Sequence, residues 1–134
     1  MNDNVEFRID PHPPLHAFAP LWHAAWGFEF TGNLESVLNR SLVHLGAFAD
    51  ERLIGYVNVA WDGGTHAFLL DPTVHPDFRH GGIGSGLVRR AIELSRERGA
   101  GVVHVDYEPH LDGFYRACGF TPTLAGLIRL DGEA

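Results

Sequence analysis

A glycine-rich segment between a predicted strand and the longest predicted helix constrains this chain more than any other feature. It covers residues 74–86 and reads VHPDFRHGGIGSG. Glycines at the start of a helix let the backbone approach a ligand closely, and the unpaired N–H groups of the first turn attract phosphate. Tight packing alone also accounts for glycines at a strand-to-helix turn. The segment therefore indicates an α/β arrangement with either an anion site or a close backbone contact at this helix start.

The spacing of these glycines excludes two familiar enzyme motifs. The dinucleotide-binding pattern Gly-x-Gly-x-x-Gly fails in every frame, because its third or sixth position falls on Ile83, Leu87 or Arg89. The nucleophile elbow Gly-x-Ser-x-Gly fails as well, because the residues two before and two after Ser85 are not glycine.

The basic residues narrow the chemistry further. All 10 of them are Arg, so the chain lacks the Lys that a Walker A loop places on phosphate and the Lys amine that Schiff-base enzymes need. The 17 acidic residues give a formal net charge of -7, which argues against nonspecific nucleic-acid binding. An anionic ligand therefore needs a local binding site.

The remaining composition predicts a protein of a reducing compartment. Cys118 is the one cysteine, so neither an internal disulfide nor a thiolate zinc site can form. The sequence has no apolar signal-like opening, and its apolar runs are shorter than the roughly 18 residues of a membrane helix. His12 and His16 have metal-like spacing, but two prolines separate them and no HExxH pattern occurs. We therefore expect a single domain over residues 1–134 that is cytoplasmic, contacts no membrane and holds no metal.

Hydrophobic periodicity predicts an alternation of strands and helices. Pro72 lacks an N–H and would interrupt a strand ladder, so a bulge or an exposed edge is expected at residues 71–73. The final two predicted strands complete the sheet. The predicted strands cover 5–10, 43–49, 53–61, 67–74, 102–107, 120–124 and 127–130, and the predicted helices cover 15–26, 34–42, 83–98 and 111–118.

Two motifs, in this order along the chain, resemble those of one enzyme family. Arg79, Gly82 and Gly84 form the pattern Arg-x-x-Gly-x-Gly, and residues 114–120 form the pattern Phe-Tyr-x-x-x-Gly-Phe. The first resembles motif A and the second resembles motif B of the GNAT acetyltransferases. The resemblance covers about residues 43–130, and the N-terminal third matches only in its strand-helix-helix order.

The resemblance implies the GNAT acyl-CoA N-acyltransferase fold, an α/β (α+β) architecture with helices flanking a central mixed, mostly antiparallel sheet. It also implies an N-acetyltransferase that moves acetyl from the cosubstrate acetyl-CoA directly to an amine of a small molecule or peptide. Two alternatives stay open: an acyl-CoA-binding sensor or interaction module without turnover, and a protein N-terminal acetyltransferase. The resemblance also allows a homodimer.

The same resemblance assigns the cofactor contacts to the strand end and the loop. The pantetheine arm would pair with the backbone of Val74 and His75, and the pyrophosphate would bind the loop amides. Glycines are needed in this loop because the Cβ of any other residue would collide with the pyrophosphate. The local positive charge that attracts the cofactor would come from Arg79, His80, Arg89 and Arg90. The loop residues implied in this way are Arg79, His80, Gly81, Gly82, Ile83, Gly84 and Ser85.

The resemblance also suggests a catalytic acid, Tyr115, which would protonate the departing thiolate. The alternative is a core tyrosine that packs with Phe114 and Phe120. Family members commonly carry Asn where this chain has Glu108, and a carboxylate cannot donate as an amide does, so Glu108 would face the acceptor instead. A base must also remove a proton from the amine, and the candidates are Asp71, Asp106, Glu108, His66 and His104.

Two groups of residues have open interpretations. Period-two alternation places His104, Asp106 and Glu108 on one strand face, either as a polar cluster beside the cofactor or as surface groups. The aromatic residues near the first predicted helix form either core packing or the wall of an acceptor pocket. They are Trp22, Trp26, Phe28 and Phe30.

Overall fold

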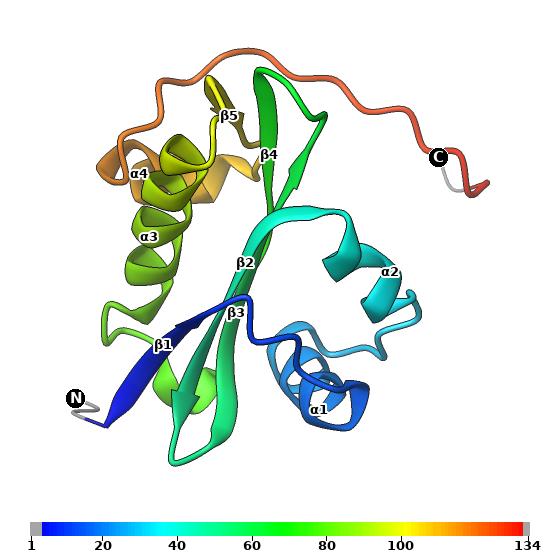
Figure 1. The fold of residues 1–134 in the computed structure, drawn as a ribbon, viewed down its shortest axis with the longest axis vertical. Coiled ribbons are helices and arrows are strands. Elements are labelled where there is room, and N and C mark those ends of the chain that lie inside the picture. The colour runs from blue at the N-terminus through cyan, green and yellow to red at the C-terminus, as the bar shows by residue number, and fades with distance from the viewer. Residues whose placement is uncertain (1–3, 133–134) are drawn as a thin grey trace.

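A five-stranded sheet forms the centre of the protein, and helices lie on both of its faces (Figure 1). The computed structural model describes residues 4–132. The strands are β1 (Val5–Ile9), β2 (Ser41–Ala49), β3 (Arg52–Trp61), β4 (His66–Val74) and β5 (Val102–His104). The α-helices are α1 (Leu15–Trp26), α2 (Leu34–Asn39), α3 (Ile83–Glu97) and α4 (Asp112–Ala117), and the short 3-10 helices are η1 (Pro76–Phe78) and η2 (Pro109–Leu111).

The strands lie in the sheet in chain order. All neighbouring pairs are antiparallel except β4 and β5, which run parallel. Residues of β2 and β3 are buried along nearly their whole length, which places these two apolar strands at the centre of the sheet. Asp50 and Glu51 join them with φ angles of 49° and 69°, the left-handed conformation of a tight hairpin turn. The expected mixed, mostly antiparallel sheet is confirmed.

The sheet separates two apolar cores. Helix α3 covers one face, where Leu87 and Ala91 are fully buried, and α1 and α2 cover the other, where Phe18 and Leu21 are buried (Figure 1). Gly55 in β3 permits the close approach of α3, because a Cβ at this position would lie 3.1 Å from Leu87 Cδ1. Both helical layers therefore depend on contacts with the same central strands.

Strands β4 and β5 diverge, and this divergence positions the candidate site. Strand β5 pairs only with residues 66–68 of β4, so within the described chain the rest of β4 is paired with β3 alone. The β3–β4 register shifts between Tyr56 and Asn58, and Asp71 has a φ of 53° in the same stretch. The bulge predicted from Pro72 is therefore confirmed.

The structure corrects three predicted elements. The two final strands, predicted at 120–124 and 127–130, are absent, because the chain after α4 runs away from the sheet and has no strand beside it (Figure 1). The strand predicted at 102–107 ends at His104, because β4 diverges beyond Phe68 and offers no ladder partner. Leu42, predicted in the second helix, lies in β2.

Candidate active site

The first turn of α3 lies between the end of β4 and the start of α4. An ideal Cβ on Gly84 would lie 3.7 Å from Val74 Cγ2 and 3.8 Å from the Phe114 ring. The two motifs found in the sequence are therefore brought together by the fold. Their meeting point is the divergence between β4 and β5.

This helix start offers a row of unpaired backbone amides. Gly82 is the N-cap, with a φ of 83° and no side-chain cap, and the first intrahelical bond runs from Gly86 N–H to the Gly82 carbonyl at 2.9 Å. Among the described residues, the N–H groups of Ile83, Gly84 and Ser85 donate to no protein acceptor. Unpaired amides at the positive end of a helix dipole favour an anion.

Neighbouring glycines in this segment serve different purposes. A Cβ on Gly86 would lie 3.1 Å from Phe7 Cζ, so Gly86 is required by packing, and Gly82 is required by its left-handed φ. A Cβ on Gly84 would make only ordinary contacts at 3.7 Å and beyond. Packing therefore requires glycine at position 86, whereas at position 84 a Cβ would fit in ordinary contact with Val74 and Phe114.

The end of β4 has one backbone edge facing the divergence. His75 N–H donates to the Ile54 carbonyl at 2.8 Å, so this amide, predicted to face the pantetheine, is already used by β3. Alternate residues of a strand direct their N–H groups to opposite sides, so the N–H of Val74 faces away from β3. Val74, more than His75, is placed to pair with an extended ligand.

The predicted cationic side chains are mostly engaged with protein groups. Arg79 donates through Nε to the Val74 carbonyl at 3.3 Å and through Nη2 to the Ala25 carbonyl at 3.2 Å, which ties the loop to α1. Arg89 donates to the Ala117 carbonyl at 2.7 Å, and Arg90 lies over the Phe7 ring. The backbone therefore supplies more of the anion-binding capacity of the loop than the side chains do.

Tyr115 on α4 is a packed aromatic residue with a group of acids around it. Its side chain is 4% exposed, and its ring stacks on Tyr107 with a centroid separation of 4.6 Å. Burial, followed by the nearby Cys118, Asp106 and Asp71, raises the pKa of Tyr115 to about 12. The hydroxyl therefore keeps its proton at neutral pH.

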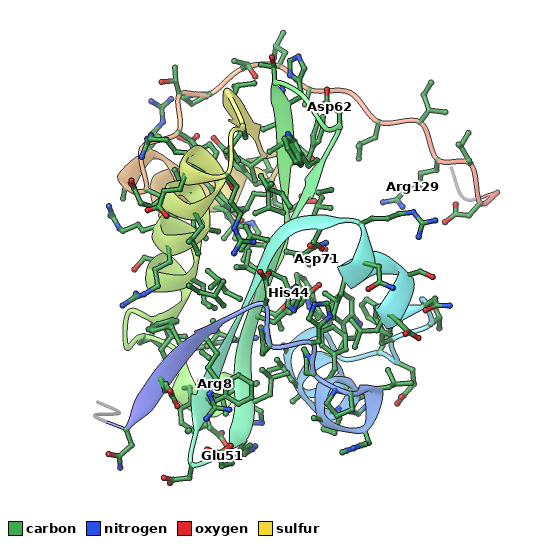
Figure 2. All side chains as sticks on the ribbon, in the orientation of Figure 1. Arg8, His44, Glu51, Asp62, Asp71 and Arg129 are labelled. Carbon is green, nitrogen blue, oxygen red and sulfur yellow. The ribbon has the colours of Figure 1, made fainter. Side chains whose placement is uncertain are left out.

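Asp71 occupies the bulge of β4, near the centre of the molecule in Figure 2. Asp71 is exposed, yet partial burial of the carboxyl raises its pKa above its usual value. The same carboxylate is near enough to Tyr56 and to Tyr115 to raise the pKa of each. The bulge thus places a proton acceptor close to a proton donor.

The other predicted acids follow β5 in the chain. Asp106 follows β5 and is near enough to Tyr115 to raise its pKa. Glu108 is exposed immediately before η2. The common strand face predicted for His104, Asp106 and Glu108 does not form, because β5 ends at His104.

His66 and His104 lie together at the other end of β4. His66 Nδ1 is 2.8 Å from His104 Nε2, and the His104 ring stacks on Phe68 at 4.8 Å. Residue 66 is the first of β4, whereas the bulge begins at Asp71. These histidines form a separate exposed pair.

An aromatic residue of α1 is bonded directly to the bulge. Trp26 Nε1 donates to Thr73 Oγ1 at 3.1 Å, and Thr73 Oγ1 donates to the Asp71 carbonyl at 2.8 Å. Trp22 packs between Trp26 and Phe30, whereas Trp26 is 44% exposed. Both interpretations of the aromatic cluster therefore describe part of it, with Trp22 in the core and Trp26 beside the site.

Sequence reasoning missed Tyr56 and Thr73. Tyr56 pairs with Thr73 across β3 and β4. The Asp71 carboxylate raises the pKa of Tyr56, and the Thr73 hydroxyl donates to the Asp71 carbonyl. Their link to the site depends on strand pairing, for which a single sequence holds no direct signal.

Residues 4–132 hold no group of three or more His, Cys, Asp or Glu side chains arranged to bind a metal ion. None of the helices in that range is long and apolar enough to cross a membrane.

The fold and the site together define an α/β protein in which a helix with open amides begins at a divergence of the sheet. The sequence model of the acetyltransferase (GNAT) family matches residues 4–120, and the chain belongs to this family.

Among curated relatives, the uncharacterized N-acetyltransferase ycf52 of Porphyra purpurea is 32% identical over 69 residues, 52% of this chain and 40% of that protein. The mycothiol acetyltransferase of Mycolicibacterium vanbaalenii is 38% identical over 66 residues, 49% of this chain and 22% of that protein. The matches thus span less than half of these two relatives.

Solved structures share the fold over nearly the whole chain. The GNAT family protein SP0256 of Streptococcus pneumoniae TIGR4 superposes with a TM-score of 0.79 at 27% identity, covering 96% of this chain and 99% of that one. The aminoglycoside N-acetyltransferase AAC(6')-Iy, solved in complex with CoA, has a TM-score of 0.73 at 20% identity, covering 96% of this chain and 95% of that one. The expected GNAT fold is confirmed.

Proposed function

We propose that this protein is an N-acetyltransferase that moves acetyl from acetyl-CoA directly to an amine of a small molecule or peptide. One observation carries the proposal: at the divergence of β4 and β5, the Asp71 carboxylate is near enough to Tyr115 to raise the pKa of its hydroxyl. The unpaired amides of α3 begin beside the same point. A proton acceptor, a proton donor and an anion-binding helix start thus share one site.

The residues present fit coenzyme A as a cosubstrate. The amides of Ile83, Gly84 and Ser85 would hold the pyrophosphate, and the free N–H of Val74 would pair with the pantetheine arm. A Cβ on Gly82 would meet no protein atom within 4 Å, and this open space would admit the phosphates. When bound, acetyl-CoA supplies an activated carbonyl. The protein would take up the proton of the amine and donate a proton to the departing sulfur.

Asp71 is the proposed general base. A protonated amine cannot attack a carbonyl, so a group at the site must take up its proton. The raised pKa of Asp71 makes its carboxylate a better proton acceptor than an ordinary aspartate. Asp106 is the second candidate, since it also lies near Tyr115.

Tyr115 is the proposed general acid. Its hydroxyl stays protonated at neutral pH because its pKa is raised to about 12. Transfer of this proton to the departing sulfur would prevent release of a free thiolate. The packing of the ring against Tyr107 would hold the hydroxyl in place during that step.

The acceptor would enter on the α1 side of the site. Trp26 is partly exposed there and bonded to the β4 bulge that carries Asp71. The net charge of -7 favours the approach of a cationic amine. Both a small molecule and a peptide N-terminus satisfy this chemistry.

Two measurements test the proposal. Acetyl-CoA should raise the melting temperature, since a ligand at a hundredfold excess over its Kd stabilises the native state by about 2.7 kcal/mol. A panel of small amines and peptides should then release free thiol from acetyl-CoA. Thermal protection without turnover for every amine would indicate the sensor alternative, and turnover with peptides alone would indicate an N-terminal acetyltransferase. Absence of protection would overturn the assignment.

A further inference from the structure

The face of the sheet toward α1 and α2 has an exposed apolar stretch on β4. Alternation places Phe68 and Leu70 on this face, because Ala67 and Leu69 beside them are buried in the core beneath α3. Phe68 is 41% exposed and Leu70 is 36% exposed. Leu70 leads directly into the bulge at Asp71. The exposed stretch, Phe68 and Leu70, is called the apolar floor below, and it begins at the candidate active site.

Neighbouring apolar side chains widen the apolar floor. On β5, Val102 is 40% exposed and pairs with His66, which shares the strand face of Phe68. At the end of α1, Trp26 borders β4 through its bond to Thr73. Single exposed apolar residues are common, whereas a group of them beside a polar site marks a ligand-binding surface.

A histidine pair holds the Phe68 ring in place. The His104 ring stacks on it with an angle of 16° between the planes, and His66 Nδ1 lies 2.8 Å from His104 Nε2. The backbone N–H of His66 donates to the Asp62 side chain at 3.2 Å. In Figure 2, Asp62 and Asp71 mark the two ends of this stretch of β4. A ring fixed in this way binds an apolar group with little further loss of side-chain entropy.

Charge is confined to one end of this surface. Asp71 and Asp106 lie at the bulge end, near Tyr115, whereas α1, β4 and β5 contain no Lys or Arg. A phosphate on the acceptor would therefore find no Lys or Arg to pair with on these elements. Sugar hydroxyls placed over Phe68 and Leu70 would lose hydrogen bonds to water without replacement. The arrangement fits an ammonium group on an apolar body.

Strand geometry sets the size of that body. Asp71 and Phe68 are three residues apart in the sequence, so about 10 Å of strand separates them at about 3.3 Å per residue. Leu70 lies between the two. An amine held at Asp71 would therefore contact Leu70 close to its nitrogen and Phe68 at its far end.

We propose that the acceptor is an amine on an apolar alkyl or aryl body, and that Phe68 and Leu70 determine this specificity. The inference rests on the proposed acetyltransferase function and names the class of its substrate. Contact between two apolar groups contributes to binding before and during the reaction alike, so its effect falls on KM more than on kcat.

Calorimetric titration with two amines of similar size tests this specificity without requiring turnover. Phenylbutylamine carries the proposed apolar body, whereas glucosamine carries hydroxyl groups, and each is titrated with and without coenzyme A. Phenylbutylamine should bind at least about tenfold more tightly, because it alone buries apolar area on the floor. Equal affinities, or no binding by either amine, would overturn the proposal.

The double variant Phe68→Thr with Leu70→Thr removes the apolar floor and keeps residues that favour strands. It should weaken phenylbutylamine binding by at least about tenfold. The matched control Ile9→Thr changes a 53% exposed residue of β1, at the opposite edge of the sheet, and should retain the preference. An unchanged preference in the double variant would overturn the role of Phe68 and Leu70.

The same double variant reports whether protein, and not an amine, covers the floor. Both replaced side chains are exposed, so without ligand the variant should keep the mass and the cooperative melting of the parent. A change of mass in sedimentation would indicate a second copy on this face. A melting temperature lowered as far as by a core substitution would indicate a segment of the same chain. Either result would overturn the proposal.

Turnover distinguishes this inference from the proposed function. With both amines as substrates, thiol release from acetyl-CoA should favour phenylbutylamine, and the difference should lie in KM. Selective binding without thiol release would contradict the acetyltransferase function and support the specificity of the surface. Thiol release with equal kcat/KM for glucosamine and phenylbutylamine would support the function and overturn the specificity.

Discussion

On one face of the sheet, α3 contributes mainly backbone groups to the site, whereas on the other face α1 contributes side chains. The α3 face relies on Gly82, Gly84 and the free amides that follow them. The α1 face relies on Trp26, which bonds Thr73, and on the bulge that holds Asp71. Backbone amides bind an anion whatever the neighbouring side chains are, whereas a contact made by a side chain depends on the residue that supplies it. The two faces should therefore respond differently to substitution.

The largest effect is expected on the α3 face. Gly84→Val should reduce acetyl-CoA affinity by at least about a hundredfold, because its methyl groups would fill space proposed for phosphate. Isothermal titration calorimetry measures this directly. Gly84→Ala should fold like the parent, since its Cβ meets protein atoms only at 3.7 Å or more.

Gly86→Ala is the matched control for that prediction. Its Cβ would lie 3.1 Å from Phe7 Cζ, so it should lower the melting temperature and leave the affinity of the folded protein unchanged. Unchanged affinity in Gly84→Val would show that the loop serves packing only.

Asp71→Asn tests the bulge between the two faces. Turnover should fall by about a hundredfold to ten-thousandfold, the usual contribution of a general base, with acetyl-CoA affinity retained. Because the pKa of Asp71 is raised, the acid limb of the kcat/KM profile should lie above 3.8, and activity should fall as pH drops through it. A larger loss in Asp106→Asn would transfer the role of base to Asp106.

The α1 face also contains a buried histidine whose effect is on stability. His44 is 1% exposed, its Nε2 accepts from His12 N–H, and burial lowers the pKa of His44 to about 4 from 6.5. The unfolded chain therefore takes up a proton as pH falls below 6.5, while the folded chain resists until about 4. The free energy of unfolding should fall by roughly 3 kcal/mol across this window.

Urea unfolding at several pH values measures this loss. His44→Gln cannot titrate and should flatten the pH dependence between 6.5 and 4. An unaltered slope in that variant would assign the loss of stability between pH 6.5 and 4 to other groups.

Tyr115→Phe separates acetyl-CoA binding from the chemical step on the α3 face. The variant keeps the ring that stacks on Tyr107 and loses only the hydroxyl. Turnover should fall about tenfold or more, since water can replace part of a general acid, and acetyl-CoA affinity should change little. Turnover equal to that of the parent would leave Tyr115 as a core residue.

The smallest effect concerns the link between α1 and the bulge. Trp26→Phe removes the indole-to-hydroxyl hydrogen bond and should lower the free energy of unfolding by about 1 kcal/mol. Thr73→Val also removes the bond to the Asp71 carbonyl and should lower it by about 2 kcal/mol. A double-mutant cycle should give a coupling energy of about 1 kcal/mol, because the two side chains share one hydrogen bond. Additive effects would mean that the bond contributes nothing to stability.

Local signals account for how much of this site could be predicted. Gly82, Gly84 and Tyr115 lie within short motifs, and Pro72 marks a bulge because a missing N–H is a property of the residue itself. The amides of Ile83 to Ser85 are free because every helix start leaves its first N–H groups unpaired. The glycine segment was thus enough to predict the family, and apolar periodicity was enough to predict α1, β3 and α3.

Only the tertiary structure decided which distant residues meet. The pairing of Tyr56 with Thr73, the bond from Trp26, and the position of Asp71 near Tyr115 depend on strand register and on the divergence of β4 from β5. The final apolar stretches show the same limit, since a strand pattern forms a strand only where a partner edge lies alongside. Periodicity is encoded locally, whereas hydrogen-bond partners and burial are set by the packing of segments far apart in the chain.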